Sequence, residues 1–130
     1  MRERAEGSKT MGFFDRFRKA APTRPEALGV TARAGQVLAP VTGRVIKLED
    51  VSDEVFSCGA MGRGCGIEPA DETVYAPVSG TLTAAGAPNF HAIGITGDAG
   101  AEVLIHVGVD TVEMRGDGFT VLAEKDAHVT

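Results

Sequence analysis

Two apolar stretches rich in Ile and Val, residues 90–95 and 101–109, flank a short Thr-Gly-Asp-Ala-Gly cluster. This pattern is typical of two antiparallel strands joined by a hairpin turn. A turn centred on the Asp-Ala dipeptide of the cluster places His91 directly across from His106. Directly opposed side chains in an antiparallel pair lie roughly 4.5–5.5 Å apart at Cβ. The hairpin therefore predicts two imidazole rings side by side.

Side chains alternate between the two faces of a strand, so the second stretch separates into two sets. The apolar face, which we expect to lie in the core, carries Val103, Ile105, Val107 and Val109. The opposite face carries Leu104, His106 and Gly108, and the same register places Ile93 across from Leu104. Because glycine has no side chain, one flank of the His106 ring is predicted to be open to a partner.

A pair of neighbouring imidazoles is suited to particular chemistry. When one ring nitrogen of a neutral histidine is held as an N–H donor, the other is a nucleophile or a metal ligand. The second histidine can hydrogen-bond a group carried by the first. The residues alone thus leave three interpretations open: a phosphoryl-transfer site, a metal site, or a structural histidine pair.

Residues 103–112, Val-Leu-Ile-His-Val-Gly-Val-Asp-Thr-Val, preceded by Gly100, resemble the phosphorylation-site signature of a known family. That family is the glucose-type enzyme IIA (EIIA) of the bacterial phosphoenolpyruvate-dependent sugar phosphotransferase system. The resemblance extends from about Leu38 to Thr130. It implies that His106 is phosphorylated at Nε2 and that His91 stabilises the phosphoryl group.

The resemblance also implies a mechanism without a required cofactor. His106 would accept the phosphoryl group from the protein HPr and pass it to a cysteine of a membrane-bound enzyme IIB. A carbonyl near Gly108 would hold the His106 Nδ1–H. Asn89 stands where many relatives have Thr or Lys, and its side chain retains a hydrogen-bond donor. Other regulatory target proteins are expected to bind the same face.

The resemblance further assigns a partner-binding surface. Asp53 matches an acidic residue that meets an arginine of HPr, and the residues that match the apolar docking surface are Val55, Phe56, Ala60 and Met61. Phe90 and Leu104 are expected to extend this surface beside the histidines, and Asp110 to lie at its rim. An apolar face with acidic residues at its edge suits a transient partner that carries arginines.

The motif Ala-Pro-Val-Thr-Gly-Arg-Val at 39–45 recurs as Ala-Pro-Val-Ser-Gly-Thr-Leu at 76–82, an offset of 37 residues. Each copy reads as a Pro-led entry, a tight turn and a strand. Internal duplication of this kind predicts an all-β, antiparallel β-sandwich or flattened barrel with pseudo-symmetry. The resemblance implies the same architecture, of the duplicated hybrid motif type.

Two alternative functions fit part of this pattern. A biotinyl or lipoyl carrier domain shares the duplicated Ala-Pro turn, but it needs a lysine at a hairpin tip, for which Lys47 is a poor match. A zinc-dependent hydrolase could use His91 and His106 as ligands, but it needs a third protein ligand. Asp53 is the candidate for it, since Asp110 lies too far along the strand. Zinc shared with a partner's carboxylate is a related expectation.

Composition limits the remaining possibilities. The formal net charge of −5 argues against nucleic-acid binding, which requires clustered Lys and Arg. The two cysteines, Cys58 and Cys65, have no second pair with which to build a four-cysteine zinc site, and we expect reduced thiols in a cytoplasmic protein. The sequence contains no apolar run of about 18 residues, the length that a membrane-spanning helix requires.

The predicted domain organisation has two parts. Residues 1–34 form a flexible N-terminal extension with a short amphipathic helix over 11–19, whose phenylalanines and basic residues suit peripheral contact with a membrane. Residues 35–130 form the EIIA-like β domain. Because members of the family continue with further strands past the position of Thr130, we expect this domain to be C-terminally incomplete.

Overall fold

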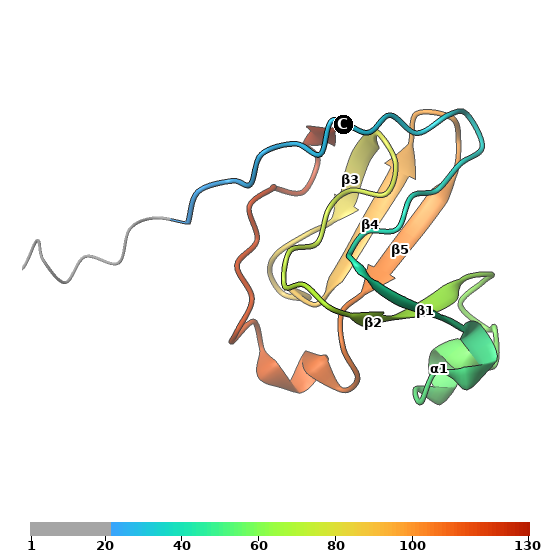
Figure 1. Cartoon of the computed structure of the whole chain (residues 1–130). Coiled ribbons are helices and arrows are strands. Elements are labelled where there is room, and N and C mark those ends of the chain that lie inside the picture. Colours follow the sequence, from blue (N-terminus) through green and yellow to red (C-terminus); the bar gives the residue numbers. More distant parts are fainter. Residues whose placement is uncertain (1–21) are drawn as a thin grey trace, which may run out of the picture.

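The computed structural model describes residues 22–130, and it consists of short strands joined by turns (Figure 1). In chain order the strands are β1 (Gly43–Lys47), β2 (Cys65–Pro69), β3 (Gly80–Ala84), β4 (Ala92–Gly97), β5 (Glu102–His106) and β6 (His128–Val129). The helical elements are a single-turn α-helix, α1 (Glu54–Ser57), and two 3₁₀ turns, η2 (Leu48–Asp50) and η3 (Thr111–Met114). Within the described residues no helix has both the length and the apolar character needed to cross a membrane.

The strands form two antiparallel sheets (Figure 1). β1 pairs with β2, and the larger sheet has the order β5-β4-β3-β6. The predicted all-β, antiparallel fold class is confirmed. The predicted helix over residues 11–19 lies outside the described residues, and residues 22–34 contain no helix or strand. The division of the chain at residue 34 stays a prediction.

The internal duplication is visible in the backbone hydrogen bonds. Leu38 N–H donates to Pro77 O at 2.9 Å, and Tyr75 N–H donates to Pro40 O at 2.7 Å. The donors are 37 positions apart (75 − 38), and so are the acceptors (77 − 40), the same offset as that of the repeated motif. The two copies therefore contact each other reciprocally, as two halves related by a pseudo-twofold axis do.

The glycine of each repeat begins a strand, at Gly43 for β1 and Gly80 for β3. A Cβ at Gly43 would overlap the Glu68 carbonyl oxygen, and a Cβ at Gly80 would overlap the Thr96 carbonyl oxygen. In both copies glycine is thus required by the close approach of the neighbouring antiparallel strand.

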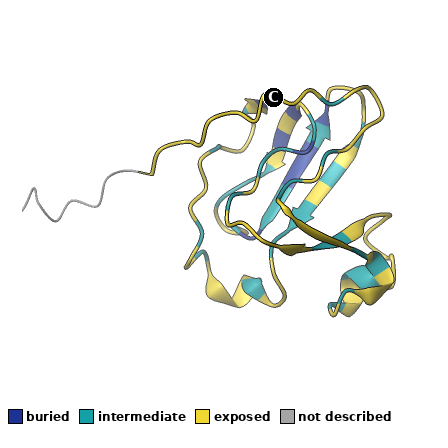
Figure 2. Ribbon diagram, in the orientation of Figure 1, coloured by how far each residue is buried: buried dark blue, intermediate teal, exposed yellow. Residues whose placement is uncertain are grey.

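The buried core lies on the larger sheet. Leu82 of β3, Ile95 of β4 and Val129 of β6 are its buried members, and β3 and β4 carry the most deeply buried positions (Figure 2). The residues packed around them are partly buried: Ala76, Val78, Ala85, Ile93 and Ala123. The strand β6 contributes to this core because it pairs with β3 across the sheet.

The β4–β5 hairpin is present, but the predicted register is wrong by one residue. Ala92, not His91, lies across from His106, and Ile93 pairs with Ile105 instead of Leu104. The cause is the loop, which has three residues (98–100) closed by a Gly97 N–H to Ala101 O hydrogen bond of 2.7 Å. Gly100 adopts φ +89° in it, as the last residue of a three-residue hairpin loop commonly does.

The expected core face of the second strand is only partly present. Val103, Ile105 and Val107 are half-buried, whereas Val109 is 50% exposed. The prediction for Val109 is wrong because β5 ends at His106, so the alternation of a strand no longer applies three residues later. Beyond that point the chain turns into η3.

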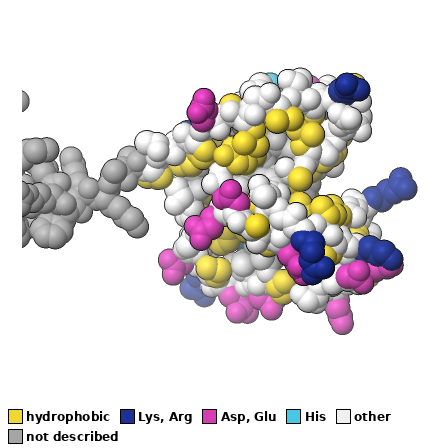
Figure 3. Space-filling model, viewed as in Figure 1, with side chains coloured by type: hydrophobic (Ala, Val, Ile, Leu, Met, Phe, Trp, Pro, Cys, Tyr) yellow, Lys and Arg dark blue, Asp and Glu magenta, His cyan; other side chains and the backbone are white. Residues whose placement is uncertain are grey.

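Acidic side chains gather along the lower edge of the face shown in Figure 3, over α1 and the orange η3 turn of Figure 1. Glu54 belongs to α1, Glu113 to η3, and Glu49 and Asp50 to the η2 turn. Basic side chains lie among the acidic ones in this region, and one of them, Lys47, is paired with Glu49.

Candidate functional site

His106 is the last residue of β5, and its ring is half-buried. The ring Nδ1 lies 3.0 Å from the carbonyl oxygen of Gly108. A carbonyl can only accept, so Nδ1 is the protonated nitrogen in this contact. In the neutral ring Nε2 then carries the free electron pair. The backbone contact thus leaves Nε2 as the His106 nitrogen that could act as a nucleophile.

Gly108 reaches this position because it adopts φ +78°, a conformation that favours glycine. The strand has ended two residues earlier, and the backbone turns so that the Gly108 carbonyl points back to the imidazole. Gly108, from which a carbonyl near His106 Nδ1 was expected, therefore supplies that carbonyl.

His91 lies immediately before β4, in a turn that Ala92 N–H closes on Asn89 O at 2.9 Å. Its ring centroid is 4.9 Å from that of His106, and the two planes are inclined at 79°. The backbone carbonyl of His91 accepts from Val107 N–H at 2.8 Å, which joins the turn to the end of β5. The structure thus brings the two rings together although the two residues are not directly paired.

The His91 side chain is only 8% exposed. Within residues 22–130 its ring makes no hydrogen bond, and no fully buried side-chain nitrogen or oxygen lacks a partner there. The two observations together mean that the His91 ring nitrogens reach the surface. A group held on the neighbouring Nε2 of His106 could therefore accept a hydrogen bond from His91.

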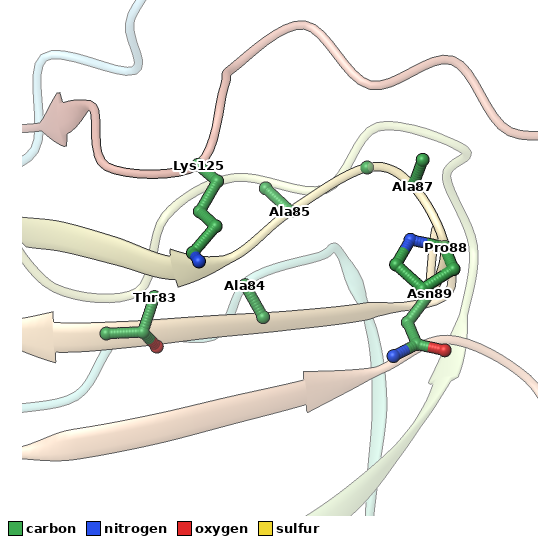
Figure 4. Close-up of a pocket in the computed structure, with 8 residues that line it drawn as sticks. Thr83, Ala84, Ala85, Ala87, Pro88, Asn89 and Lys125 are labelled. Carbon is green, nitrogen blue, oxygen red and sulfur yellow. The ribbon is translucent and has the colours of Figure 1, made fainter.

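Asn89 lies at the beginning of the same turn, where its side chain is exposed. It lines one end of a hollow of about 210 Å³, together with Ala84 of β3 and Lys125 of the C-terminal segment (Figure 4). Neither histidine lines this hollow, and it is smaller than the roughly 300–1,000 Å³ of typical small-ligand pockets. This hollow is therefore not part of the arrangement around the two histidines.

The helix α1 brings an aromatic ring to His106. The Phe56 centroid lies 4.6 Å from that of His106, with the planes inclined at 45°. The position of α1 depends on Asp53, whose Oδ1 accepts from Val55 N–H at 3.0 Å and whose backbone carbonyl accepts from Phe56 and Ser57. Asp53 therefore has a structural role as the N-cap of α1, beside its predicted role toward a partner.

The other predicted docking residues differ in exposure. Val55 is 58% exposed, Met61 55% and Leu104 44%, and Ala60 is also exposed. Because they are exposed, these side chains are available to a partner, and Phe56, next to Val55 in α1, contacts the His106 ring.

Phe90 and Asp110, the last two predicted docking residues, have structural contacts of their own. Phe90 is half-buried, and its ring occupies the space where a Cβ at Gly116 would lie. Asp110 is exposed and precedes η3 with φ +55°.

The two alternative functions gain no support from the site. Within residues 22–130, no three His, Cys, Asp or Glu residues lie close enough together to hold a metal ion. Asp53, the candidate third ligand, is the cap of α1. Lys47 is the last residue of β1, paired with Cys65, and residues 48–64 separate the two strands, so Lys47 is not at the tip of a tight hairpin.

Residues 35–130 match the family model of the phosphoenolpyruvate-dependent sugar phosphotransferase system, EIIA 1. The chain belongs to this family. The EIIA domain is also similar to the β-glucoside-specific EIIBCA component of Halalkalibacterium halodurans, with 46% identity over 99 residues. These residues make up 76% of the chain but only 15% of that much longer relative.

Among solved structures, the EIIA domain resembles the glucose permease IIA from Mycoplasma capricolum. The TM-score is 0.69 at 43% identity, and the match covers 73% of this chain and 61% of that one. At this level of identity the likeness extends to the sequence as well as the fold. The fold and family implied by the resemblance at residues 100–112 are thus confirmed.

One residue near the histidines was not singled out by the sequence. The Thr111 hydroxyl donates to the Val107 carbonyl oxygen, across the turn that contains Gly108. The sequence does contain a signal for this contact: a threonine stands three residues after a glycine, at the point where the strand pattern ends. A short polar side chain there can bond to nearby backbone and stabilise a turn.

Proposed function

We propose that this EIIA domain is a phosphocarrier that accepts a phosphoryl group from HPr on Nε2 of His106 and passes it to a cysteine of an enzyme IIB. The observation that carries the proposal is the hydrogen bond between His106 Nδ1 and Gly108 O, which leaves Nε2 with a free electron pair. The His91 ring beside it supports the proposal, because its N–H can donate to a phosphoryl oxygen.

The transfer is an in-line displacement. The N–P bond of the donor phosphohistidine breaks as Nε2 of His106 forms a new one, and the donor imidazole leaves with the bonding electron pair. The protein contributes positioning and electrostatic stabilisation: Gly108 fixes the ring, and His91 donates a hydrogen bond to the phosphoryl oxygens. The apolar surroundings, including the Phe56 ring, keep water away from the intermediate.

The surface around His106 supports a protein as donor. Val55, Met61 and Leu104 are exposed apolar side chains, and the acidic residues Asp53 and Asp110 are two positions from Val55 and four from His106 in the sequence. A donor with apolar residues and arginines around its own histidine would complement this surface. The EIIBCA name of the Halalkalibacterium relative, in which EIIA is joined to EIIB, supports enzyme IIB as the acceptor.

Several finer expectations stay predictions. These are a cytoplasmic location, membrane contact through residues 11–19, further regulatory partners that bind the same face, and a zinc ion shared by His91 and His106 with a partner. None of them is needed for the transfer itself, for which no cofactor is expected.

The test uses phosphoenolpyruvate, enzyme I and HPr, with the mass of the EIIA domain as readout. Wild-type protein is expected to gain one phosphoryl group, and His106→Gln none, because the nucleophilic nitrogen is lost. His91→Gln is expected to gain the group but to pass it to enzyme IIB more than tenfold more slowly, because a flexible amide replaces the positioned imidazole N–H that stabilises the transition state. Phosphorylation of His106→Gln would overturn the assignment.

His128 provides the matched control. Its ring lies on β6, where Nε2 is 3.0 Å from the Asp98 carboxylate, in the part of the molecule away from His106. His128→Gln is expected to be phosphorylated and to transfer at the wild-type rate. A loss of transfer in this variant as large as in His91→Gln would show that the assay reports general damage to the fold.

A further inference from the structure

We propose that Thr111 is a positioning residue for phosphoryl transfer, because it holds the turn whose carbonyl selects the reactive nitrogen of His106. Only the kinetic part of this inference, the effect on the rate of phosphoryl transfer, depends on the proposed function. Its structural part, the control of the His106 tautomer, applies to the unphosphorylated protein and is tested there.

The Thr111 hydroxyl acts on the peptide unit directly before Gly108. It donates to the Val107 carbonyl oxygen, which belongs to the same peptide plane as the Gly108 N–H. Holding this plane keeps one side of the Gly108 turn in place. In that turn Gly108 has φ +78° and its carbonyl oxygen lies 3.0 Å from His106 Nδ1.

The Thr111 methyl group acts on Gly108 itself. A Cβ at Gly108 would overlap Thr111 Cγ2, so the methyl occupies the space beside the Gly108 Cα. The hydroxyl and the methyl of Thr111 thus contact the same turn from one side. A threonine carries both groups on one Cβ, and its χ1 rotation is restricted.

The same turn is connected to the second histidine. Val107 donates its N–H to the carbonyl oxygen of His91 at 2.8 Å, while its own carbonyl accepts from Thr111. Thr111, Val107 and His91 are therefore linked by consecutive hydrogen bonds. A change at Thr111 is expected to alter the relative position of the two imidazoles as well as the tautomer of His106.

The decisive measurement is the ¹⁵N chemical shifts of the His106 ring in the unphosphorylated protein, which report the nitrogen that carries the proton. Wild type is expected to be in the Nδ1–H form. Thr111→Val keeps the shape but removes the donor, and it is expected to increase the Nε2–H form. Thr111→Ser keeps the donor and is expected to retain the wild-type pattern.

The rate of phosphoryl acceptance from HPr is expected to follow the tautomer. Thr111→Val should be about tenfold slower, the effect of one lost hydrogen bond in the positioning of the nucleophile. Thr111→Ser should be within about threefold of wild type. Thr120→Val, a change at an exposed threonine, is the control and should leave both the ¹⁵N pattern and the rate unchanged.

The outcomes separate the two proposals. A wild-type His106 in the Nε2–H form, or an unchanged tautomer in a folded Thr111→Val, would overturn the role of Thr111. The wild-type measurement needs no variant, so the inference is testable even if Thr111→Val does not fold. A wild-type protein that HPr does not phosphorylate would overturn the proposed function, whatever the tautomer.

Discussion

A single backbone contact determines the chemistry of His106. The sequence signature predicts that this histidine is the reactive one, but a free imidazole offers two nitrogens of similar basicity. The Gly108 carbonyl, 3.0 Å from Nδ1, occupies one of them. Glycine has a different role at Gly43 and Gly80, where the missing side chain permits close strand pairing.

The close approach at Gly80 gives a prediction for stability. Gly80→Ala is expected to lower the free energy of unfolding by about 2 kcal/mol or more, because its Cβ overlaps the Thr96 carbonyl and the strand must shift. Urea unfolding measures the change.

Gly64→Ala is the matched control for this glycine. A Cβ there meets nothing within 4 Å, and Gly64 is not among the glycines with positive φ. The control is expected to lie within about 0.5 kcal/mol of wild type. Equal effects of the two substitutions would contradict the argument from strand spacing.

At the scale of elements, the site depends on three short segments that have few interactions of their own. The helix α1 has one turn, η3 has one turn, and the turn before β4 is closed by one hydrogen bond of 2.9 Å. Isolated helices of this length are not stable in water. The helix α1 is held by its Asp53 cap and by the contact of Phe56 with His106, and η3 is joined to the end of β5 by the bond from Thr111 to Val107.

The cap of α1 can be separated from the charge of Asp53. Asp53→Ala removes the bond to Val55 N–H and is expected to destabilise α1 by about 1 kcal/mol, which corresponds to about fivefold faster amide exchange at residues 55–57. Asp53→Asn retains a good capping side chain and should exchange at nearly the wild-type rate. Amide exchange measured by NMR gives both values.

The same pair of variants tests the partner surface. If the Asp53 carboxylate meets an arginine of HPr, Asp53→Asn should weaken HPr binding although α1 is intact, and the effect should diminish with added salt. If Asp53→Asn binds as wild type while Asp53→Ala binds weakly, Asp53 serves only as the cap that holds Phe56 beside His106.

At the scale of the whole molecule, two copies of one motif build two sheets with a small buried core. The reciprocal bonds between Leu38 and Pro77 and between Tyr75 and Pro40 join the copies. In the described part of the chain the buried core is small: Leu82, Ile95 and Val129, with Pro77 also fully buried. Since small domains are stable by only about 5–15 kcal/mol, each of these side chains matters.

The smallness of the core predicts a strong response to its truncation. Ile95→Ala is expected to lower the free energy of unfolding by about 2–5 kcal/mol, and Ile95→Val by about 0.5–1.5 kcal/mol, because a cavity adds to the lost apolar contact. Thermal and urea unfolding measure both. A loss below about 1 kcal/mol for Ile95→Ala would show that the core lies elsewhere.

The sequence by itself determined the fold class, the duplication and the closeness of His91 and His106 in space. Each of these rests on local information: alternation along a strand, the repeated Ala-Pro-x-x-Gly turn, and the ten-residue signature around His106. Even the closeness of His91 and His106 in space follows from a hairpin, because a hairpin joins residues that are near each other in the sequence. The EIIA family assignment depends on the same residues.

Only the tertiary structure decided how these residues are arranged in space. The register of β4 and β5 depends on whether the loop has two residues or three, and the Thr-Gly-Asp-Ala-Gly cluster is compatible with both. The protonated nitrogen of His106, the Phe56 ring beside it and the Thr111 bond to Val107 depend on backbone directions after the strand has ended. Periodicity carries no information there, because the chain is no longer periodic.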